Sequence, residues 1–515
     1  MGVAFVCDKI CIKRRIIMIN ATKEFLANQD ALYDARKNEI RSTKDNLDIK
    51  GTAYYVSISG DDANDGLSPE KSWRSLEKAS NTALSAGDAI LFKRGDLFRG
   101  QVTTQPGVTY GAYGEGAKPE FRGWNENLAK PELWTLANAE KNIWKYTRPI
   151  LDPGTLVFNE GEAHSIKLIP SYRDLKFVCR DDESRDFVME NEMIRDLDIF
   201  WHFDMTLTRQ PSKGEDFPVP VTGDNSYGAL YLRCDKGNPG EIFNSIEAVV
   251  RRVTFRVGGN ANVHVDNICM KYYCFGVSAG GHSVGLHVTN CEIGWIGGNI
   301  QHYFGTDPNY PQGTRGSVTR FGNAIEIYGG CEDYLVENCY LYQSYDAGMT
   351  HQVTTWEKRT MHKVRYLNNL VEKCVYGIEY FLDQKDGECE SCMDDIVMDG
   401  NIIRLSGYGW GQQRHNVHTP ALIKGWSYVN TARNYSITNN IFDRSAYKLV
   451  HLVSLKPESK PVMDNNTFIQ DFGGMIGRIG ANENGEPPIE IFDDNAEDKI
   501  NNIFGDKNAK VYIIK

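Results

Sequence analysis

A recurring unit in the second half of the chain constrains the fold more than any other feature of the sequence. From about residue 248, an asparagine recurs before or within a short apolar segment, as in VTNCEI, VENCYLY and DGNIIR. The seven asparagines are Asn267, Asn290, Asn338, Asn369, Asn401, Asn440 and Asn466. The first interval is about 23 residues, and periods of this length are typical of solenoids. The later intervals are longer, as if loops had been added to a common unit.

One such unit cannot bury its own apolar face, so neighbouring units must stack. Asparagines at equivalent positions of stacked coils can form a ladder of side-chain hydrogen bonds. The pattern therefore predicts an all-β protein, a right-handed parallel β-helix of the pectate-lyase-like solenoid type. An ordinary β-sandwich with accidental asparagine spacing is the alternative.

The remainder of the chain divides into three further segments. Residues 1–50 are charged and predict an N-terminal helical arm, and residues 51–123 read as strand, turn, short helix and strand at the start of the β-helix. Residues 124–247 contain Trp134, Trp144 and Trp201 among Pro and Gly, which indicates short antiparallel strands in an inserted or appended β-module. Residues 248–515 then form the parallel β-helix that carries the active-site cleft.

Charge and composition exclude several classes of protein. A net charge of −11 over 515 residues argues against a general nucleic-acid binder. No apolar run is long enough to span a membrane. In MGVAFVCDKICIKRRIIM the basic residues follow the apolar run, so we expect no signal peptide and a cytoplasmic location. The 12 cysteines are scattered, and the Cys389–Cys392 pair stands alone, so we expect reduced thiols, no metal and no cofactor. The oligomeric state is left open.

Alignment of the units predicts one row of side chains on the outer face of a sheet. Ser278, Glu326, Thr350 and Glu379 fall on successive coils, and their apolar neighbours, such as Ile325, point inward by strand alternation. Glu326 and Glu379 are then two coils apart, roughly 9.6 Å between backbones. This spacing is near the separation of about 6.5–9.5 Å in inverting glycosidases and favours inversion weakly. A third candidate carboxylate, Asp346, enters the strand one coil from Glu326.

Extra residues at about 301–324, 353–363 and 383–394 fall beside the same sheet and are expected to wall it into a cleft. Aromatic rings and carboxylates in a long groove suit sugar chains. The expected catalytic residues are Glu326, Asp346 and Glu379. The expected substrate-binding residues are Trp295, His302, Thr350, His351, Tyr380, Trp410, Arg414 and His415. Structural alternatives remain open: an exposed ion-paired strand residue for Glu326, a turn cap for Asp346, inward packing for His351, and core or turn packing for the tryptophans.

Two sets of segments resemble known carbohydrate-active proteins. YYVSISGDDANDGLSPEKSWRSLEKA, GDAILFKRGDLFRGQ and GVTYGAYGEGAKPEFRG resemble the N-terminal part of carbohydrate-active parallel β-helix proteins. CEIGWIGGN, RFGNAIEIYGG, YLVENCYLYQSYDAGMTHQ, YGIEYF and GYGWGQ resemble proteins grouped near glycoside hydrolase family 141, which is associated with fucosidase and xylanase activity. The resemblance covers roughly residues 52–123 and 230–450. It implies a β-helix glycosidase whose carboxylates carry over as Glu326, Asp346 and Glu379.

The leading hypothesis is therefore a glycoside hydrolase that uses paired carboxylates on an oligosaccharide or polysaccharide substrate. The first rival is a polysaccharide lyase, which needs a base and a cation to neutralise a uronate. Its candidate cations are Arg315, Arg320, Lys358, Arg359 and Arg365. The second rival is a glycan-binding β-helix without catalysis, in which the outward carboxylates are dispensable.

Overall fold

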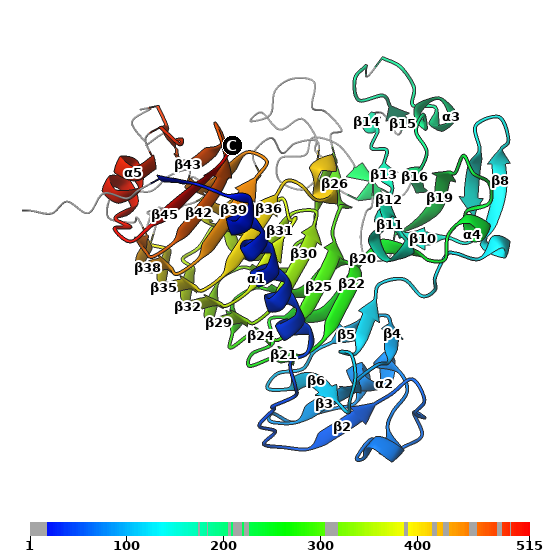
Figure 1. Cartoon of the computed structure of the whole chain (residues 1–515). Coiled ribbons are helices and arrows are strands. Elements are labelled where there is room, and N and C mark those ends of the chain that lie inside the picture. Colours follow the sequence, from blue (N-terminus) through cyan, green and yellow to red (C-terminus); the bar gives the residue numbers. More distant parts are fainter. Residues whose placement is uncertain are drawn as a thin grey trace, which may run out of the picture.

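The protein is a parallel β-helix with an N-terminal helix along one face and a β-module at one end (Figure 1). The computed structural model describes residues 18–515 except 174–175, 183, 204–207, 210–218, 221–225, 304–317, 386–389, 415–419, 426–431, 453–460, 481–486 and 495. The predicted fold class is confirmed, because strands from successive coils pair in parallel along the whole solenoid.

Each coil contributes strands to three faces. The first face, here called the back sheet, consists of β2 (Ala53–Val56), β3 (Ala89–Lys93), β6 (Thr109–Tyr113), β21 (His264–Asp266), β24 (His287–Thr289), β29 (Cys331–Glu337), β32 (Thr360–Leu367), β35 (Cys392–Asp399), β38 (Ala432–Thr438) and β41 (Val462–Asp464), with β23 (Ser283–Val284) beside β29.

The second face, here called the arm sheet, follows the asparagine turn. It consists of β4 (Leu97–Arg99), β7 (Glu120–Arg122), the first half of β22 (Cys269–Gly280), β25 (Glu292–Ile296), β30 (Tyr340–Ser344), β33 (Leu370–Glu372), β36 (Ile402–Ser406), β39 (Ile441–Ser445), β42 (Thr467–Asp471) and β45 (Lys510–Ile514).

The third face, here called the groove sheet, follows a bend. It consists of β5 (Val102–Thr103), β20 (Ile246–Gly258), the second half of β22, β28 (Ile325–Tyr328), β31 (Ala347–Thr355), β34 (Tyr376–Gln384), β37 (Ala421–Gly425), β40 (Lys448–Leu452) and β43 (Met475–Ile479). β44 (Ile489–Ile491) pairs antiparallel with β43 at its far edge.

The apolar side chains between the three faces form one continuous core from Val56 to Ile513. Beside it runs a ladder of buried asparagines. Asn369 and Asn401 each donate their side-chain amide to the next asparagine oxygen, Asn401 and Asn440, at 2.9 and 3.0 Å. Asn440 donates to Asn466 at 3.1 Å, and Asp506 accepts from Asn466 at 2.8 Å. The predicted ladder is confirmed for these coils.

The earlier asparagines occupy a different position of the turn. Asn267, Asn290 and Asn338 have φ angles of 62°, 55° and 53°, in the left-handed region that asparagine tolerates. The residue with this conformation in the next coil is Asn368, and Asn369 follows it. The seven asparagines are therefore not all equivalent. The alignment of the coils on these asparagines is shifted by one residue for Asn267, Asn290 and Asn338 relative to the later four.

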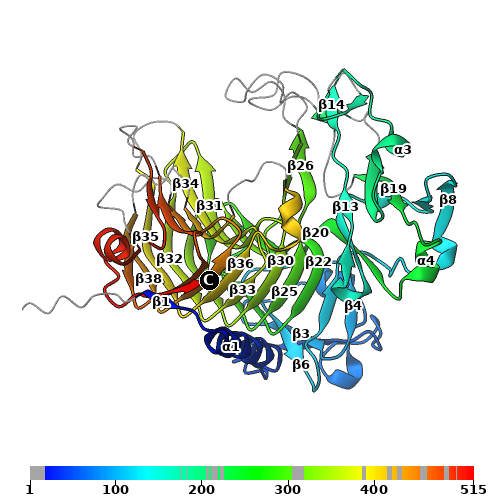
Figure 2. The same cartoon turned by 45° about the horizontal axis from the view of Figure 1, so that its top comes forward.

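The N-terminal arm is a docked helix. α1 (Lys23–Arg41) crosses the arm sheet, where Tyr33 and Ile40 are buried against Tyr340, Leu370 and Ile402 (Figures 1 and 2). Before it, β1 (Met18–Asn20) pairs in parallel with β45. The arm therefore contacts both early and late coils of the solenoid.

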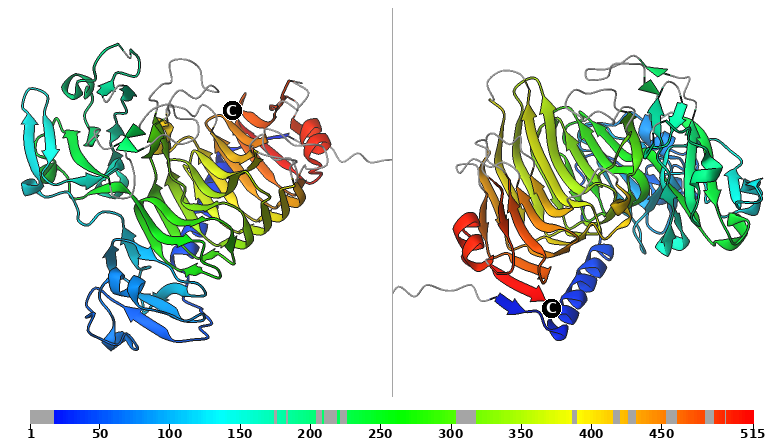
Figure 3. Two further views of the ribbon diagram at one scale, coloured as in Figure 1. Left: turned by 180° about the vertical axis from the view of Figure 1, so that it is seen from behind. Right: turned by 90° about the horizontal axis from the view of Figure 1, so that it is seen from above.

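Residues between β7 and β20 form the predicted β-module, which lies at the same end of the solenoid as the N-terminal coils (Figure 3). Its main sheet consists of β8 (Trp134–Asn138), β9 (Ile143–Tyr146), β10 (Ile150–Leu151), β13 (Ile166–Lys167), β16 (Asp198–Phe203) and β19 (Tyr227–Arg233). Trp134 and Trp201 are buried in a separate core. β11 (Pro153–Phe158) joins the module to the solenoid by pairing with β20 and β12 (Ala163–His164).

Short elements complete the described structure. The helices are α2 (Leu76–Asn81), α3 (Met189–Glu192), α4 (Pro239–Ile242), α5 (Ala496–Lys499) and the turns η1 (Pro69–Lys71), η2 (Pro131–Leu133), η3 (Asn159–Gly161), η4 (Trp410–Gln413) and η6 (Ile500–Phe504). The hairpins are β14 (Ser171–Arg173) with β15 (Lys176–Val178), β17 (Thr208–Arg209) with β18 (Val219–Pro220), and β26 (Asn299–Tyr303) with β27 (Val318–Phe321). In the described part of the chain, no helix combines the length and apolarity needed to cross a membrane.

Candidate active site

The outer face of the groove sheet carries the predicted row of side chains. Ser278 pairs with Glu326, Glu326 with Thr350, and Thr350 with Glu379, each on the neighbouring strand. The row continues through Lys424, His451 and Arg478 on β37, β40 and β43. The alternation of apolar and polar residues in these strands thus places two carboxylates in one outward row.

A cavity of about 860 Å³ lies over this row and contains all three predicted carboxylates, Glu326, Asp346 and Glu379. On one side, the β26–β27 hairpin supplies Gln301 and Phe321 to its wall. On the other side, β31 and β34 are nine residues long, whereas β28 and β37 have four and five. Figure 2 shows β31 and β34 extending past their neighbours. Asp383, near the end of β34, lines the cavity. Described residues from all three predicted segments, such as Gln301, Thr354 and Lys385, line the cavity, and residues 304–317 of the first segment lie outside the described residues.

Glu326 is a half-buried carboxyl with neutral hydrogen-bond partners. The Asn323 side-chain amide donates to it at 2.7 Å, and the Ser278 hydroxyl lies 3.4 Å away. Asn323 also accepts the backbone N–H of Ala347 at 2.9 Å, which ties Glu326 to the turn that carries Asp346. Burial raises the pKa of Glu326 to about 7, and the charge of Asp346 adds to the rise, while the two hydrogen bonds oppose it.

Asp346 has the cationic partner that Glu326 lacks in the described part of the chain. Its carboxylate forms an ion pair with Arg414, which follows η4. Burial raises the pKa of Asp346, and the Arg414 guanidinium opposes this rise. When two neighbouring carboxyls hold one proton between them, the proton is more stable on the carboxyl that has no cationic partner. The arrangement therefore favours a protonated Glu326 beside an ionised Asp346 near neutral pH.

Glu379 is buried, with 5% of its surface exposed, and accepts a hydrogen bond of 2.6 Å from the side-chain amide of Gln352. Cations lie on two sides of it. Burial lowers the pKa of Arg414, yet the carboxylates of Asp346 and Glu379 raise it above its ordinary value. Burial lowers the pKa of Lys424 to about 8, and Glu379 opposes that change. Arg414 and Lys424 thus place positive charge near the Glu379 carboxylate.

The aromatic residues of the cavity are Phe321, Tyr328 and Phe381, none of which was predicted from the sequence. Tyr328 is 42% exposed, and its ring lies 6.2 Å from that of Phe381 in an edge-on arrangement. Both follow a row carboxylate by two residues, Glu326 and Glu379, so they share its face. Continuing the two-residue period beyond each glutamate would have identified them.

Four of the predicted binding residues are internal, which corrects the prediction. His351 and Tyr380 are fully buried inside the solenoid, where their rings stack at 5.2 Å. They directly follow Thr350 and Glu379, so strand alternation turns them inward. Trp295 and Trp410 are buried as well and pack in a small cluster at the bend between two faces, with Tyr345 5.2 Å from Trp410. None of the four contacts the cavity.

The remaining predictions divide between the groove and the undescribed part of the chain. Arg414 lines the cavity. Thr350 lies in the row but is completely buried, and its hydroxyl has no hydrogen-bond partner among the described residues. The side chain of His302 and the whole of His415 lie outside the described residues, as does Arg315.

The four described cations among those considered for a lyase have other partners. Arg320 is buried and donates to the carbonyls of Gly298 and Gly154 at 2.6 and 2.8 Å. Arg365 pairs with Asp395 on the back sheet. Arg359 pairs with Glu357, and Lys358 lies 3.6 Å from Glu390. None of these four is among the residues that line the cavity.

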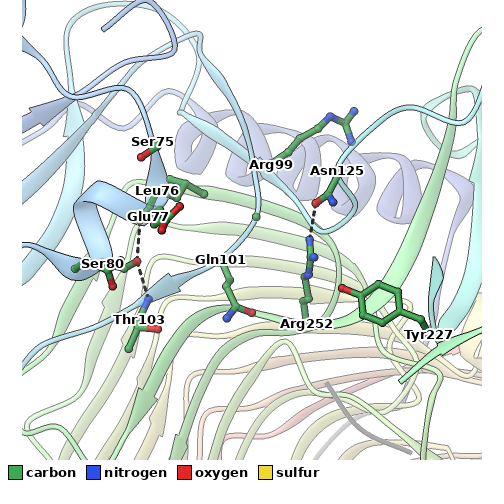
Figure 4. Close-up of a pocket in the computed structure, with 12 residues that line it drawn as sticks. Ser75, Leu76, Glu77, Ser80, Arg99, Gln101, Thr103, Asn125, Tyr227 and Arg252 are labelled. Atoms are coloured by element: carbon green, nitrogen blue, oxygen red, sulfur yellow. Dashed lines mark hydrogen bonds between the residues drawn. The ribbon is translucent and has the colours of Figure 1, made fainter. Parts of the chain in front are cut away.

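A second, smaller cavity of about 520 Å³ lies further along the same face, between the N-terminal coils and the β-module (Figure 4). Thr103, at its edge, pairs with Arg256, which pairs with Ser278 of the larger cavity. In Figure 4, Arg252 donates to the side chain of Asn125 at 2.8 Å, and the hydroxyl of Tyr227 points toward Arg252. The outward row therefore connects the two cavities.

No protein-family model matches the sequence, and none of the curated proteins matches it. Among solved structures, XylC in complex with xylose is 12% identical, with a TM-score of 0.40 over 90% of this chain and 83% of that chain. A GH136 lacto-N-biosidase from Eubacterium ramulus is 13% identical, with a TM-score of 0.34 over 95% and 70%. A family 28 exopolygalacturonase from Yersinia enterocolitica is 11% identical, with a TM-score of 0.25 over 90% and 79%. These similarities are too low to assign an activity to this chain.

Proposed function

We propose that the protein is a glycoside hydrolase whose catalytic centre is the row of carboxylates in the larger cavity. The supporting observation is that Glu326, Asp346 and Glu379 share one cavity in different environments. Glycosidic hydrolysis needs one carboxyl that is protonated and one that is ionised, and environment alone can separate the two.

In this proposal Glu326 is the general acid. With a pKa raised to about 7, it keeps its proton near neutral pH and donates it to the departing glycosidic oxygen as the bond to the anomeric carbon breaks. Asp346, paired with Arg414, stays ionised and holds negative charge beside the acid. That charge also favours return of a proton to Glu326 after each turnover.

Glu379 is the general base. It lies two strands from Glu326 in the row, roughly 9.6 Å between backbones, which leaves room for a water molecule between the carboxyls. Glu379 takes a proton from this water as the oxygen attacks the anomeric carbon. Net addition of water across the bond then inverts the anomeric configuration. Tyr328 and Phe381 offer ring surfaces for the apolar faces of the sugars.

A screen of oligosaccharides with Glu326→Gln, Glu379→Gln and the unchanged protein tests the proposal. We expect new reducing ends from the unchanged protein and a loss of turnover of at least about 100-fold in each variant, since a positioned acid or base contributes about 10²–10⁴. Glu332→Gln, on the back sheet, is the matched control. Full turnover in both groove variants would refute the assignment. An unsaturated product that absorbs in the ultraviolet would identify a lyase instead.

The finer identity of the substrate is a further part of the proposal. The resemblance to glycoside hydrolase family 141 supports trials with fucosides and xylans first. Product anomers followed by nuclear magnetic resonance decide the stereochemistry. A first product whose anomeric configuration is opposite to that of the substrate supports Glu379, two strands from Glu326, as the base. A first product with the same configuration would make Asp346, nearer to Glu326, the candidate nucleophile.

A further inference from the structure

The row that carries the carboxylates continues into a group of basic side chains. Lys424 pairs directly with Glu379, His451 with Lys424, and Arg478 with His451. Lys448 lies three residues before His451 on β40. These four residues, Lys424, Lys448, His451 and Arg478, are here called the basic cluster. They lie on three neighbouring strands that begin one strand spacing, about 4.8 Å, from Glu379.

Most of the basic cluster is buried. Lys424, Lys448 and His451 are 2%, 0% and 7% exposed. The Lys424 ammonium donates to Nδ1 of His451 at 2.7 Å. The Lys448 ammonium lies 4.4 Å from the centre of the Tyr447 ring and has no hydrogen-bond partner among the described residues.

Among the described residues, two acids stand near Lys424, Lys448 and Arg478. Glu379 lies at one end of the basic cluster, and at the other end Glu490 on β44 lies 3.4 Å from Arg478. Burial lowers the pKa of Lys448 to about 7, and Lys424 and Arg478 lower it further while Glu490 opposes them. Burial also lowers the pKa of His451 to about 2. A buried ammonium gains from an acceptor, and an anion at this place would give Lys448 one that the described residues do not supply.

Building on the proposed function, we propose that the basic cluster binds the carboxylate or sulfate of an acidic sugar unit, so that the substrate is an anionic oligosaccharide. The order of the row supports this substrate class. A sugar chain that lies along the outward row with its scissile bond between Glu326 and Glu379 places the following unit toward Lys424 and Lys448. Carboxylate and sulfate present several acceptor oxygens, which suit the ammonium and guanidinium donors of the basic cluster.

The first experiment measures binding without turnover. The probes are glucuronate, inorganic sulfate and, as the neutral counterpart, glucose, each titrated into the whole protein while its melting temperature is followed. We expect glucuronate or sulfate to raise the melting temperature of the unchanged protein and of Glu326→Gln, and glucose to have no effect. A rise with glucuronate alone would indicate a site for a uronate, and a rise with sulfate alone would indicate a site for a sulfated sugar.

Two variants connect this binding to the basic cluster. Lys448→Met and Arg478→Gln are each expected to weaken the effective anion about tenfold or more, the usual effect of losing a charge-assisted hydrogen bond. Lys448→Met also removes a buried charge, so it is expected to fold. Arg433→Gln is the control, since Arg433 is 64% exposed on the back sheet beside Asp394. It is expected to bind the anion as the unchanged protein does.

The outcomes separate this inference from the proposed function. Absence of any anion effect, or equal affinity in the unchanged protein and both basic-cluster variants, would overturn the inference. Anion binding that depends on the basic cluster, combined with full turnover in Glu326→Gln, would leave the anion site intact and refute the proposed acid. Where hydrolysis is found, the unchanged protein should prefer acidic oligosaccharides to their carboxyl-reduced forms. A fall of about tenfold in this preference in Lys448→Met would support both the proposed function and the anion site.

Discussion

At the scale of single residues, Glu326 has its raised pKa because the solenoid holds it half-buried beside Asp346, and its hydrogen-bond partners among the described residues are an amide and a hydroxyl. If it is the acid, its protonated form is the active one. We predict that kcat/KM falls as the pH rises through about 7 and that this limb of the pH profile follows Glu326. A profile that is flat between pH 6 and 8, roughly one unit on either side of that pKa, would contradict the role.

The same shift predicts a dependence of stability on pH. A folded-state pKa of about 7 against an ordinary value of 4.5 means that the folded protein binds more protons between these pH values than the unfolded chain. Stability is therefore lost as the pH rises through this window. Glu326→Gln removes this loss. At pH 8 the unfolding free energy of the variant, measured by urea titration, should therefore exceed that of the unchanged protein by on the order of 1 kcal/mol. At pH 4 the two unfolding free energies should be equal.

The two-residue period of a strand explains several of the outcomes of the sequence predictions, and tertiary contacts explain the others. The two-residue period of a strand placed Glu326 and Glu379 outward, and the same period places Tyr328 and Phe381 outward and His351 and Tyr380 inward. Asp346 and Arg414 meet only because a turn and a loop from different coils converge. No spacing in the chain encodes that contact, and the packing of Trp295 and Trp410 at a bend is equally remote from sequence periodicity.

At the scale of elements, the asparagine ladder holds the turn between the back sheet and the arm sheet. Asn401 accepts from the backbone and side chain of Asn369 at 3.0 and 2.9 Å and donates to Tyr366 and Asn440. We predict that Asn401→Ala lowers the unfolding free energy by about 2–4 kcal/mol, because several buried partners lose their hydrogen bonds together. Urea unfolding followed by circular dichroism measures this.

The neighbouring turn position supplies the control for that prediction. Asn439 has a φ angle of 58° and sits outside the buried ladder. Asn439→Gly keeps this conformation available and should change stability by less than about 1 kcal/mol. An Asn401→Ala variant no less stable than Asn439→Gly would show that the ladder contributes little. The sequence predicted the ladder, but the two turn positions both carry asparagine and were not told apart.

At the scale of the whole molecule, α1 is part of the packed structure. Tyr33 is fully buried between α1 and the arm sheet, and the Arg404 guanidinium lies 4.4 Å from the centre of its ring. We predict that Tyr33→Ala lowers the unfolding free energy by about 3 kcal/mol, as is usual for truncating a large buried ring. Leu32→Ala, at a position that is 45% exposed, should cost less than about 0.5 kcal/mol. Equal losses would mean that the helix is not docked in solution.

The docked helix also limits how the solenoid can change in length. At one end of α1, Phe25 stacks on Tyr512 of β45 at 4.0 Å, and at the other Arg41 pairs with Glu292 of β25 at 2.6 Å. Six strand spacings separate β25 from β45, about 29 Å, and a 19-residue helix is about 28 Å long. The length of the helix thus matches the number of coils between its two anchoring contacts. Duplicating or deleting one coil between β25 and β45 would move one of the two anchoring contacts by a full strand spacing. A variant with an altered number of coils therefore needs α1 to be longer or shorter by about three residues.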